Sequence, residues 1–146
     1  MKLKAEVNDD GAKKLILQKA GRISAKSKEA LEQLGKEEVD ITRARIDTGK
    51  VTPDGTPWAP WSIATLRERT RTGTTAGGLL HKTGALSQSI KYKLNPNSLV
   101  ISSDSPYAQY LQNGTSNMPA RPFLGWNQEA INNFRERLHQ AILQND

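Results

Sequence analysis

The chain of 146 residues has no cysteine and only two histidines, His81 and His139. Without cysteine there are no disulfides, thiolate metal sites or thiol nucleophiles. The two histidines are far apart in sequence, and neither has carboxylates at the spacing of a metal site. Gly73, Gly77 and Gly78 are not followed by the Lys-Ser or Lys-Thr of a phosphate-binding loop. We therefore expect no metal, no cofactor and no catalytic residue, and the protein is not predicted to be an enzyme.

Apolar residues are also sparse. They make up 36% of the chain, and the mean hydropathy is −0.65. No run approaches the ~18 apolar residues of a membrane span, and the first residues lack the apolar core of a secretory signal. We expect a single domain over residues 1–146 with one modest core, soluble in the cytoplasm during assembly and without membrane contact.

Positive charge is in excess. Lys and Arg number 21 against 15 acids, which gives a net charge of +6 and a pI near 9.7. This balance favours an acidic partner, either nucleic acid or an acidic protein face, although solubility alone explains it equally well. No groove-reading motif is present, so only non-specific contact with DNA is expected. The residues expected to form a basic rim, facing a lumen or a partner, are Arg67, Arg69, Arg71 and Lys82.

Residues 12–48 contain no proline, and apolar or small residues recur there at intervals of three and four. The pattern predicts one long amphipathic helix, which Gly49 ends by taking the left-handed cap position. Such a helix would be about 50 Å long at 1.5 Å per residue, so part of it would overhang the domain. The alternative is a two-helix hairpin broken near Gly35.

Two proline-rich segments carry all three tryptophans of the chain. Pro57 and Pro60 in residues 49–62, and Pro119 and Pro122 in residues 115–126, enforce extended backbone and predict two rigid arms. Each arm presents its side chains either to the domain's own core or to a neighbouring subunit. Of the two tryptophans in the first arm, we expect Trp58 to lie inside the subunit and Trp61 to face a neighbour. The residues predicted to contact another subunit or partner are Trp58, Trp61, Tyr107, Arg121, Phe123 and Trp126.

The other elements are short. Ser62 is a suitable cap for a helix to about Arg69, followed by a glycine-rich loop over 70–79 that is expected to be mobile. Alternating polar and apolar residues predict a β-hairpin over 90–103. A last helix is predicted over 127–146. Together these elements indicate an α+β fold with a long N-terminal helix, a small antiparallel sheet flanked by short helices, and a C-terminal helix.

Four motifs follow one another along the chain: Asp54-Gly55-Thr56-Pro57-Trp58-Ala59-Pro60-Trp61-Ser62, Leu79-Leu80 with Thr83-Gly84, Pro106-Tyr107-Ala108, and Pro119-Ala120-Arg121-Pro122-Phe123-Leu124-Gly125. They occur in the order found in tailed-phage virion morphogenesis proteins, which the chain resembles from about residue 36 onward. The resemblance is to the tail completion family that includes the Mu-type G protein and the P2-type S protein. Three positions depart from the usual pattern: Trp61 replaces a frequent leucine, Ile63 a frequent proline, and His81-Lys82 an acidic or small pair.

The resemblance implies a tail completion or terminator fold that assembles as a ring, most often a hexamer, at the head-proximal end of the tail. The implied role is to stop growth of the tail tube and to join the tail to the neck of the head, without enzymatic activity. The implied partners are other copies of the chain, tail-tube and possibly sheath proteins, and head-side neck or connector proteins. Two alternatives stay open: a head-side neck adaptor and a basic DNA-binding accessory protein.

Overall fold

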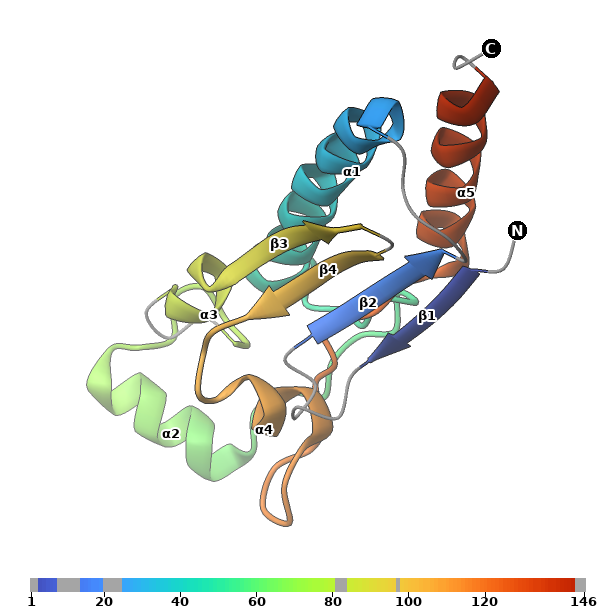
Figure 1. Cartoon of the computed structure of the whole chain (residues 1–146). Helices are drawn as coiled ribbons and strands as arrows, with labels where there is room; N and C mark the ends of the chain where they lie inside the picture. The colour runs from blue at the N-terminus through green and yellow to red at the C-terminus, as the bar shows by residue number, and fades with distance from the viewer. Residues whose placement is uncertain (1–2, 8–13, 20–24, 81–83, 97, 144–146) are drawn as a thin grey trace.

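The computed structural model describes residues 3–7, 14–19, 25–80, 84–96 and 98–143. Two pairs of strands are each followed by helices along the chain, and Figure 1 labels the elements. Their bounds are β1 Leu3–Val7, β2 Lys14–Lys19, α1 Ala25–Ala44, the π-helix η1 Arg45–Gly49, α2 Ile63–Thr72, α3 Ala85–Gln88, β3 Ile90–Asn95, β4 Ser98–Ser103, α4 Ala108–Asn113 and α5 Gln128–Leu143.

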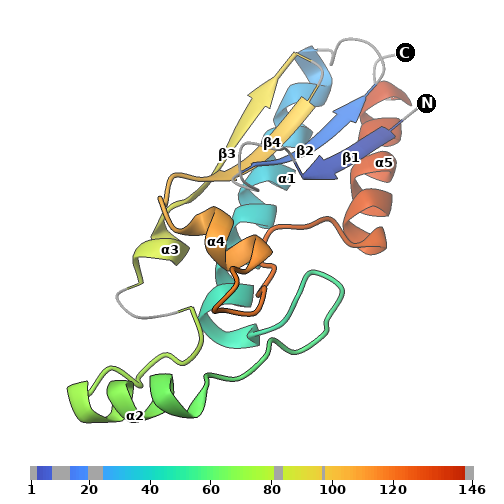
Figure 2. The same ribbon diagram turned by 90° about the horizontal axis from the view of Figure 1, so that it is seen from below.

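The strands form one four-stranded antiparallel sheet in the order β1-β2-β4-β3. Helices α1 and α5 pack together over the sheet (Figures 1 and 2). The core lies between the two layers because both contribute fully buried apolar side chains. The α+β class, with a long helix near the N-terminus and a small antiparallel sheet, is thus confirmed. The largest fully buried side chains are Leu31, Leu34, Ile46, Ile90, Leu99, Ile101, Phe123, Leu124, Phe134 and Leu138.

The predicted helix over 12–48 is wrong in its first part, because residues 14–19 form strand β2. The strand pairs with β1 and β4, and Leu15 lies opposite Ile101. A short run of three apolar residues, Leu15 to Leu17, fits a buried strand as well as one side of a helix, so periodicity alone cannot separate them. Since α1 has 20 residues and a length of about 30 Å, the predicted overhang disappears.

Gly35 does not break α1, so the alternative of a two-helix hairpin is also wrong. A Cβ atom at this position would lie 2.6 Å from Cδ2 of Tyr92 and 3.1 Å from Cδ1 of Leu99. The glycine is therefore the point at which the helix backbone approaches β3 and β4 most closely, and its lack of a side chain sets the distance between the layers.

The end of the helical segment also differs from the prediction. Lys50, not Gly49, takes the left-handed conformation, with φ 54°, and its backbone N–H donates to the carbonyl oxygen of Arg45 at 2.8 Å. The Lys50 ammonium donates to the carbonyl oxygens of Ile46 and Leu79, at 2.6 and 2.7 Å. These side-chain bonds hold a non-glycine residue in an unfavourable backbone region and tie the helix end to the loop after α2.

The glycine-rich loop starts later than residue 70, because α2 continues to Thr72. Ser62 accepts a hydrogen bond from the backbone N–H of Thr65 at 3.1 Å and begins the helix as predicted. Gly73 ends the helix in the left-handed conformation, with φ 69°. Farther along, β3 and β4 pair from Ile90 to Ser103 and form the hairpin.

Candidate subunit interface

The two proline-rich arms lie against each other. The indole N–H of Trp58 donates to the carbonyl oxygen of Pro122 at 2.7 Å. The Arg121 guanidinium donates to the carbonyl oxygens of Ala59 and Pro60, at 2.8 and 2.9 Å. The arms thus satisfy each other's backbone carbonyls, which two extended segments without strand partners would otherwise leave to water.

A buried glutamine fixes the second arm to the body. The side-chain oxygen of Gln112 accepts from the backbone N–H groups of Phe123 and Leu124, both at 3.0 Å, and its amide nitrogen donates to the Leu124 carbonyl at 2.8 Å. The guanidinium of Arg45 donates to the Phe123 carbonyl at 2.7 Å. Sequence analysis missed both residues, because neither stands in a pattern that distinguishes it from other polar helix residues.

Three of the residues predicted to contact a neighbour are buried within the subunit, as the sequence also predicts for Trp58. Trp58, Arg121 and Phe123 are 5%, 6% and 0% exposed. Their polar groups are used inside the chain, because the arms need partners for their own backbone. Trp126 is half-buried and packs against the core, and its indole N–H is buried without a hydrogen-bond partner in the described residues.

The other two predicted interface residues line an open groove of about 790 Å³. Trp61 is half-buried on one wall, with the Arg69 guanidinium 4.6 Å from its ring centroid. Tyr107 is 67% exposed on the opposite wall, and Tyr110, which sequence analysis missed, is 49% exposed. Tyr110 could have been identified from its spacing of three residues from Tyr107, because this spacing places the two side chains on one side of a helical segment. The groove is thus a largely apolar surface edged by aromatic rings.

Helix α2 forms one wall of this groove and stands apart from the body of the subunit (Figure 2). None of its residues is buried. On the side away from the groove, Ile63 is 71% exposed and Leu66 is 46% exposed. Isolated helices this short are only marginally stable in water, so α2 is an element that gains from contact with another molecule.

The structure separates the residues predicted as a basic rim. Arg67 and Arg71 are exposed on α2. Arg69 turns toward the groove, where it lies over Trp61 and donates to the Thr74 carbonyl at 3.2 Å. Lys82 lies outside the described residues. Of the three predicted rim residues on α2, Arg67 and Arg71 are therefore exposed, and Arg69 is turned toward the groove.

Within the described residues, no three His, Cys, Asp or Glu side chains are grouped so that they could hold a metal ion. His139 is exposed on α5, and His81 lies outside the described part of the chain. No described helix is long and apolar enough to span a membrane. The main features of the described surface are thus the groove, its exposed aromatic rings and helix α2.

No curated protein and no solved structure matches the chain. The model of the phage virion morphogenesis family matches residues 8–143, which is nearly the whole chain. The chain therefore belongs to the phage virion morphogenesis family, and its role is in the building of the phage particle.

Proposed function

We propose that this protein completes the phage tail by assembling into a ring, most simply a hexamer, at the head-proximal end of the tail tube. The observation that carries the proposal is α2, a helix with no buried residue beside a groove edged by exposed aromatics. The outer side of α2 and the groove on its other side are two different surfaces. Surfaces of this kind give head-to-tail contacts between identical subunits, and such contacts produce rings when the rotation closes.

The ring would end growth of the tail tube and present a surface to the neck of the head. Its partners would be tail-tube protein, sheath protein in a contractile tail, and neck or connector proteins. The rigid pair of arms supports this role, because Trp58 and Arg121 hold both arms in one position before assembly. A pre-organised surface loses less conformational entropy on binding. The role is structural and involves no catalytic step.

Deletion of the gene from the phage tests the proposal. Electron microscopy of the lysate is expected to show separate heads and tails, with tails of irregular length. Complete virions would contradict the proposal. Separate heads beside tails of uniform length would favour the head-side adaptor instead, since an adaptor does not control the length of the tube.

The mass of the purified protein in solution, measured with and without tail-tube protein, tests ring assembly directly. A mass of several subunits, appearing alone or upon addition of tube, is expected. A chain that stays monomeric in both conditions would contradict the ring. Binding to DNA that weakens steeply with salt, in a protein that stays monomeric, would favour the DNA-binding accessory protein, because phosphate contacts release counterions.

A further inference from the structure

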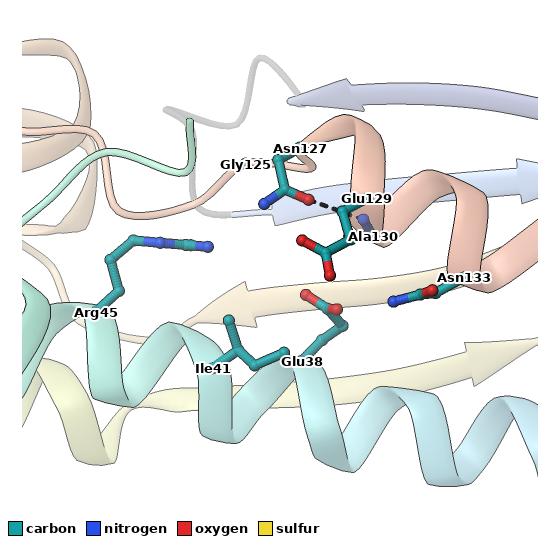
Figure 3. A pocket seen from close by; sticks show the side chains of 8 residues that line it. All are labelled: Glu38, Ile41, Arg45, Gly125, Asn127, Glu129, Ala130 and Asn133. Carbon is teal, nitrogen blue, oxygen red and sulfur yellow. Dashed lines mark hydrogen bonds between the residues drawn. The ribbon is translucent and has the colours of Figure 1, made fainter. Parts of the chain in front are cut away.

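A second pocket, of about 190 Å³, lies between the C-terminal half of α1 and the start of α5 (Figure 3). We call it the acidic pocket. Glu38 from α1 and Glu129 from α5 point toward each other across it, and Arg45 reaches toward it from one end. The residues that line it are Glu38, Ile41, Arg45, Gly125, Asn127, Glu129, Ala130 and Asn133.

Glu38 is the unusual member of this pocket. It is only 6% exposed, and its carboxylate makes no hydrogen bond with the residues that the structure describes. Burial raises its pKa, the neighbouring Glu37 adds to the rise, and the charges of Arg45 and Arg137 oppose it. Among the described residues Glu38 forms no ion pair with Arg45, whose guanidinium donates to the Phe123 carbonyl at 2.7 Å. The Glu38 side chain is largely buried and faces the pocket without a hydrogen-bond donor, so the pocket favours an added cationic donor.

The pocket also has an apolar edge. Ile41 is 49% exposed although it lies on α1, where Leu34 and Val39 are buried in the core. Ile41 lies seven residues after the buried Leu34, a spacing typical of one side of a helix, but the structure places it at the edge of the acidic pocket. A ligand for this surface therefore combines a cation with apolar groups beside it.

The outer side of α2 combines a cation with neighbouring apolar side chains. Ile63, Leu66 and Arg67 are spaced by three and four residues, so they share one side of the helix. All three are exposed, and Arg67 makes no hydrogen bond or ion pair within the described part of the chain. Thr65 and Arg69 face the groove instead. The outer side of α2 thus has no partner among the described residues of its own subunit.

We infer that the acidic pocket of one subunit receives Arg67 from α2 of a second copy of this chain, with Ile63 and Leu66 packing beside Ile41. The inference deepens the proposed function, on which it rests, by naming one subunit contact of the ring. A planar guanidinium offers two parallel donors and fits between two facing carboxylates.

The arrangement of the molecule requires the arginine to come from another copy. Helix α2 lies at one end of the subunit, away from α5, in both views (Figures 1 and 2). Because the outer side of α2 and the acidic pocket are different surfaces, each subunit can bind one neighbour through α2 and another through the pocket. The contact is head-to-tail and repeats around a closed ring.

Disulfide trapping tests the contact, and the absence of native cysteine makes it specific. The variant Arg67→Cys/Glu129→Cys, oxidised in the presence of tail-tube protein, is expected to give a ladder of cross-linked oligomers on a denaturing gel. The matched control is Arg67→Cys/Glu136→Cys, since Glu136 is exposed on the same helix about two turns away. The control is expected to stay monomeric on the gel.

Charge exchange gives an independent measurement. Arg67→Glu and Glu129→Arg are each expected to weaken association about tenfold or more, and the double exchange is expected to recover most of that loss. Glu38→Gln keeps the shape of the side chain and is expected to weaken association in a chain that stays folded. Folding of every variant is checked by circular dichroism, so loss of assembly is separated from loss of structure.

The outcomes distinguish this contact from the ring itself. Oligomers that persist in Glu129→Arg, with no cross-linking through Arg67→Cys, would overturn the contact and leave the ring standing. A native chain that is monomeric with and without tail-tube protein would overturn both. Cross-linking of Glu129→Cys to a tail-tube or neck protein, without the self-linked ladder, would assign the pocket to that protein and overturn the contact.

Discussion

The indole N–H of Trp58 and the carbonyl oxygen of Pro122 lie 2.7 Å apart although 64 residues separate them in the sequence. This bond, with the two from Arg121 to the carbonyls of Ala59 and Pro60, joins the arms into one unit. The aromatic residues of the arms consequently divide into two groups. Trp58 and Phe123 fill the core, while Trp61 is left at the groove.

Replacing the two tryptophans of the first arm should separate folding from assembly. Trp58→Ala is expected to lower the free energy of unfolding by roughly 3–5 kcal/mol, because the side chain is buried and leaves a cavity. Trp61→Ala should leave the stability of the monomer nearly unchanged and weaken the ring. Chemical denaturation measures the first effect and sedimentation the second. Equal losses of stability in both variants would contradict this division.

Gly35→Ala should destabilise the protein although alanine is the better helix former by about 1 kcal/mol. The added methyl group would lie 2.6 Å from the Tyr92 ring, and overpacking of this kind costs typically about 1–3 kcal/mol. Thermal unfolding measures the change. Gly35→Ala combined with Tyr92→Leu should recover part of the loss, and Lys36→Ala, at an exposed position on the same helix, serves as the control.

Gln112→Leu should be among the most destabilising substitutions of a polar residue in this chain. It removes three hydrogen bonds and leaves two backbone N–H groups and one carbonyl of the second arm without their partner. Each buried group left unsatisfied costs about 1–3 kcal/mol. Gln112→Glu retains an acceptor for the two N–H groups and should lose less. Gln140→Ala, on the exposed side of α5, should change the free energy of unfolding little.

The sequence predicted the parts of the fold that depend on local chemistry. Ser62 as a cap, the hairpin turn before β4 and the stiff backbone at the prolines act over a few residues, so their patterns are readable. Strand β2 was missed because its pairing with β4 joins residues far apart in sequence, such as Leu15 and Ile101. Pairings between such distant residues cannot be predicted from the local strand propensity of the sequence.

The candidate site was predictable in outline for the same reason. Exposed aromatic and basic residues near α2 and α4 stood out in the sequence. The buried polar residues Glu38, Arg45 and Gln112 did not, because their roles depend on what the fold brings beside them. The exposure of Ile41 depends on which side of α1 packs on the sheet. The close approach at Gly35 determines that side.

The raised pKa of Glu38 predicts that the isolated subunit loses stability as pH rises. Burial is its main cause, and it favours the neutral form in the folded state over an unfolded chain with a pKa near 4.5. The stabilising contribution is complete below that value and is lost as pH rises through the folded pKa. Glu38→Gln should therefore be more stable than the native chain at pH 7 and should show a flatter dependence on pH in urea denaturation between pH 4 and 8. Glu136→Gln, exposed on α5, is the matched control and should keep the native pH dependence. If Glu38→Gln and the native chain lost stability in parallel across this range, the carboxylate would not be the group responsible.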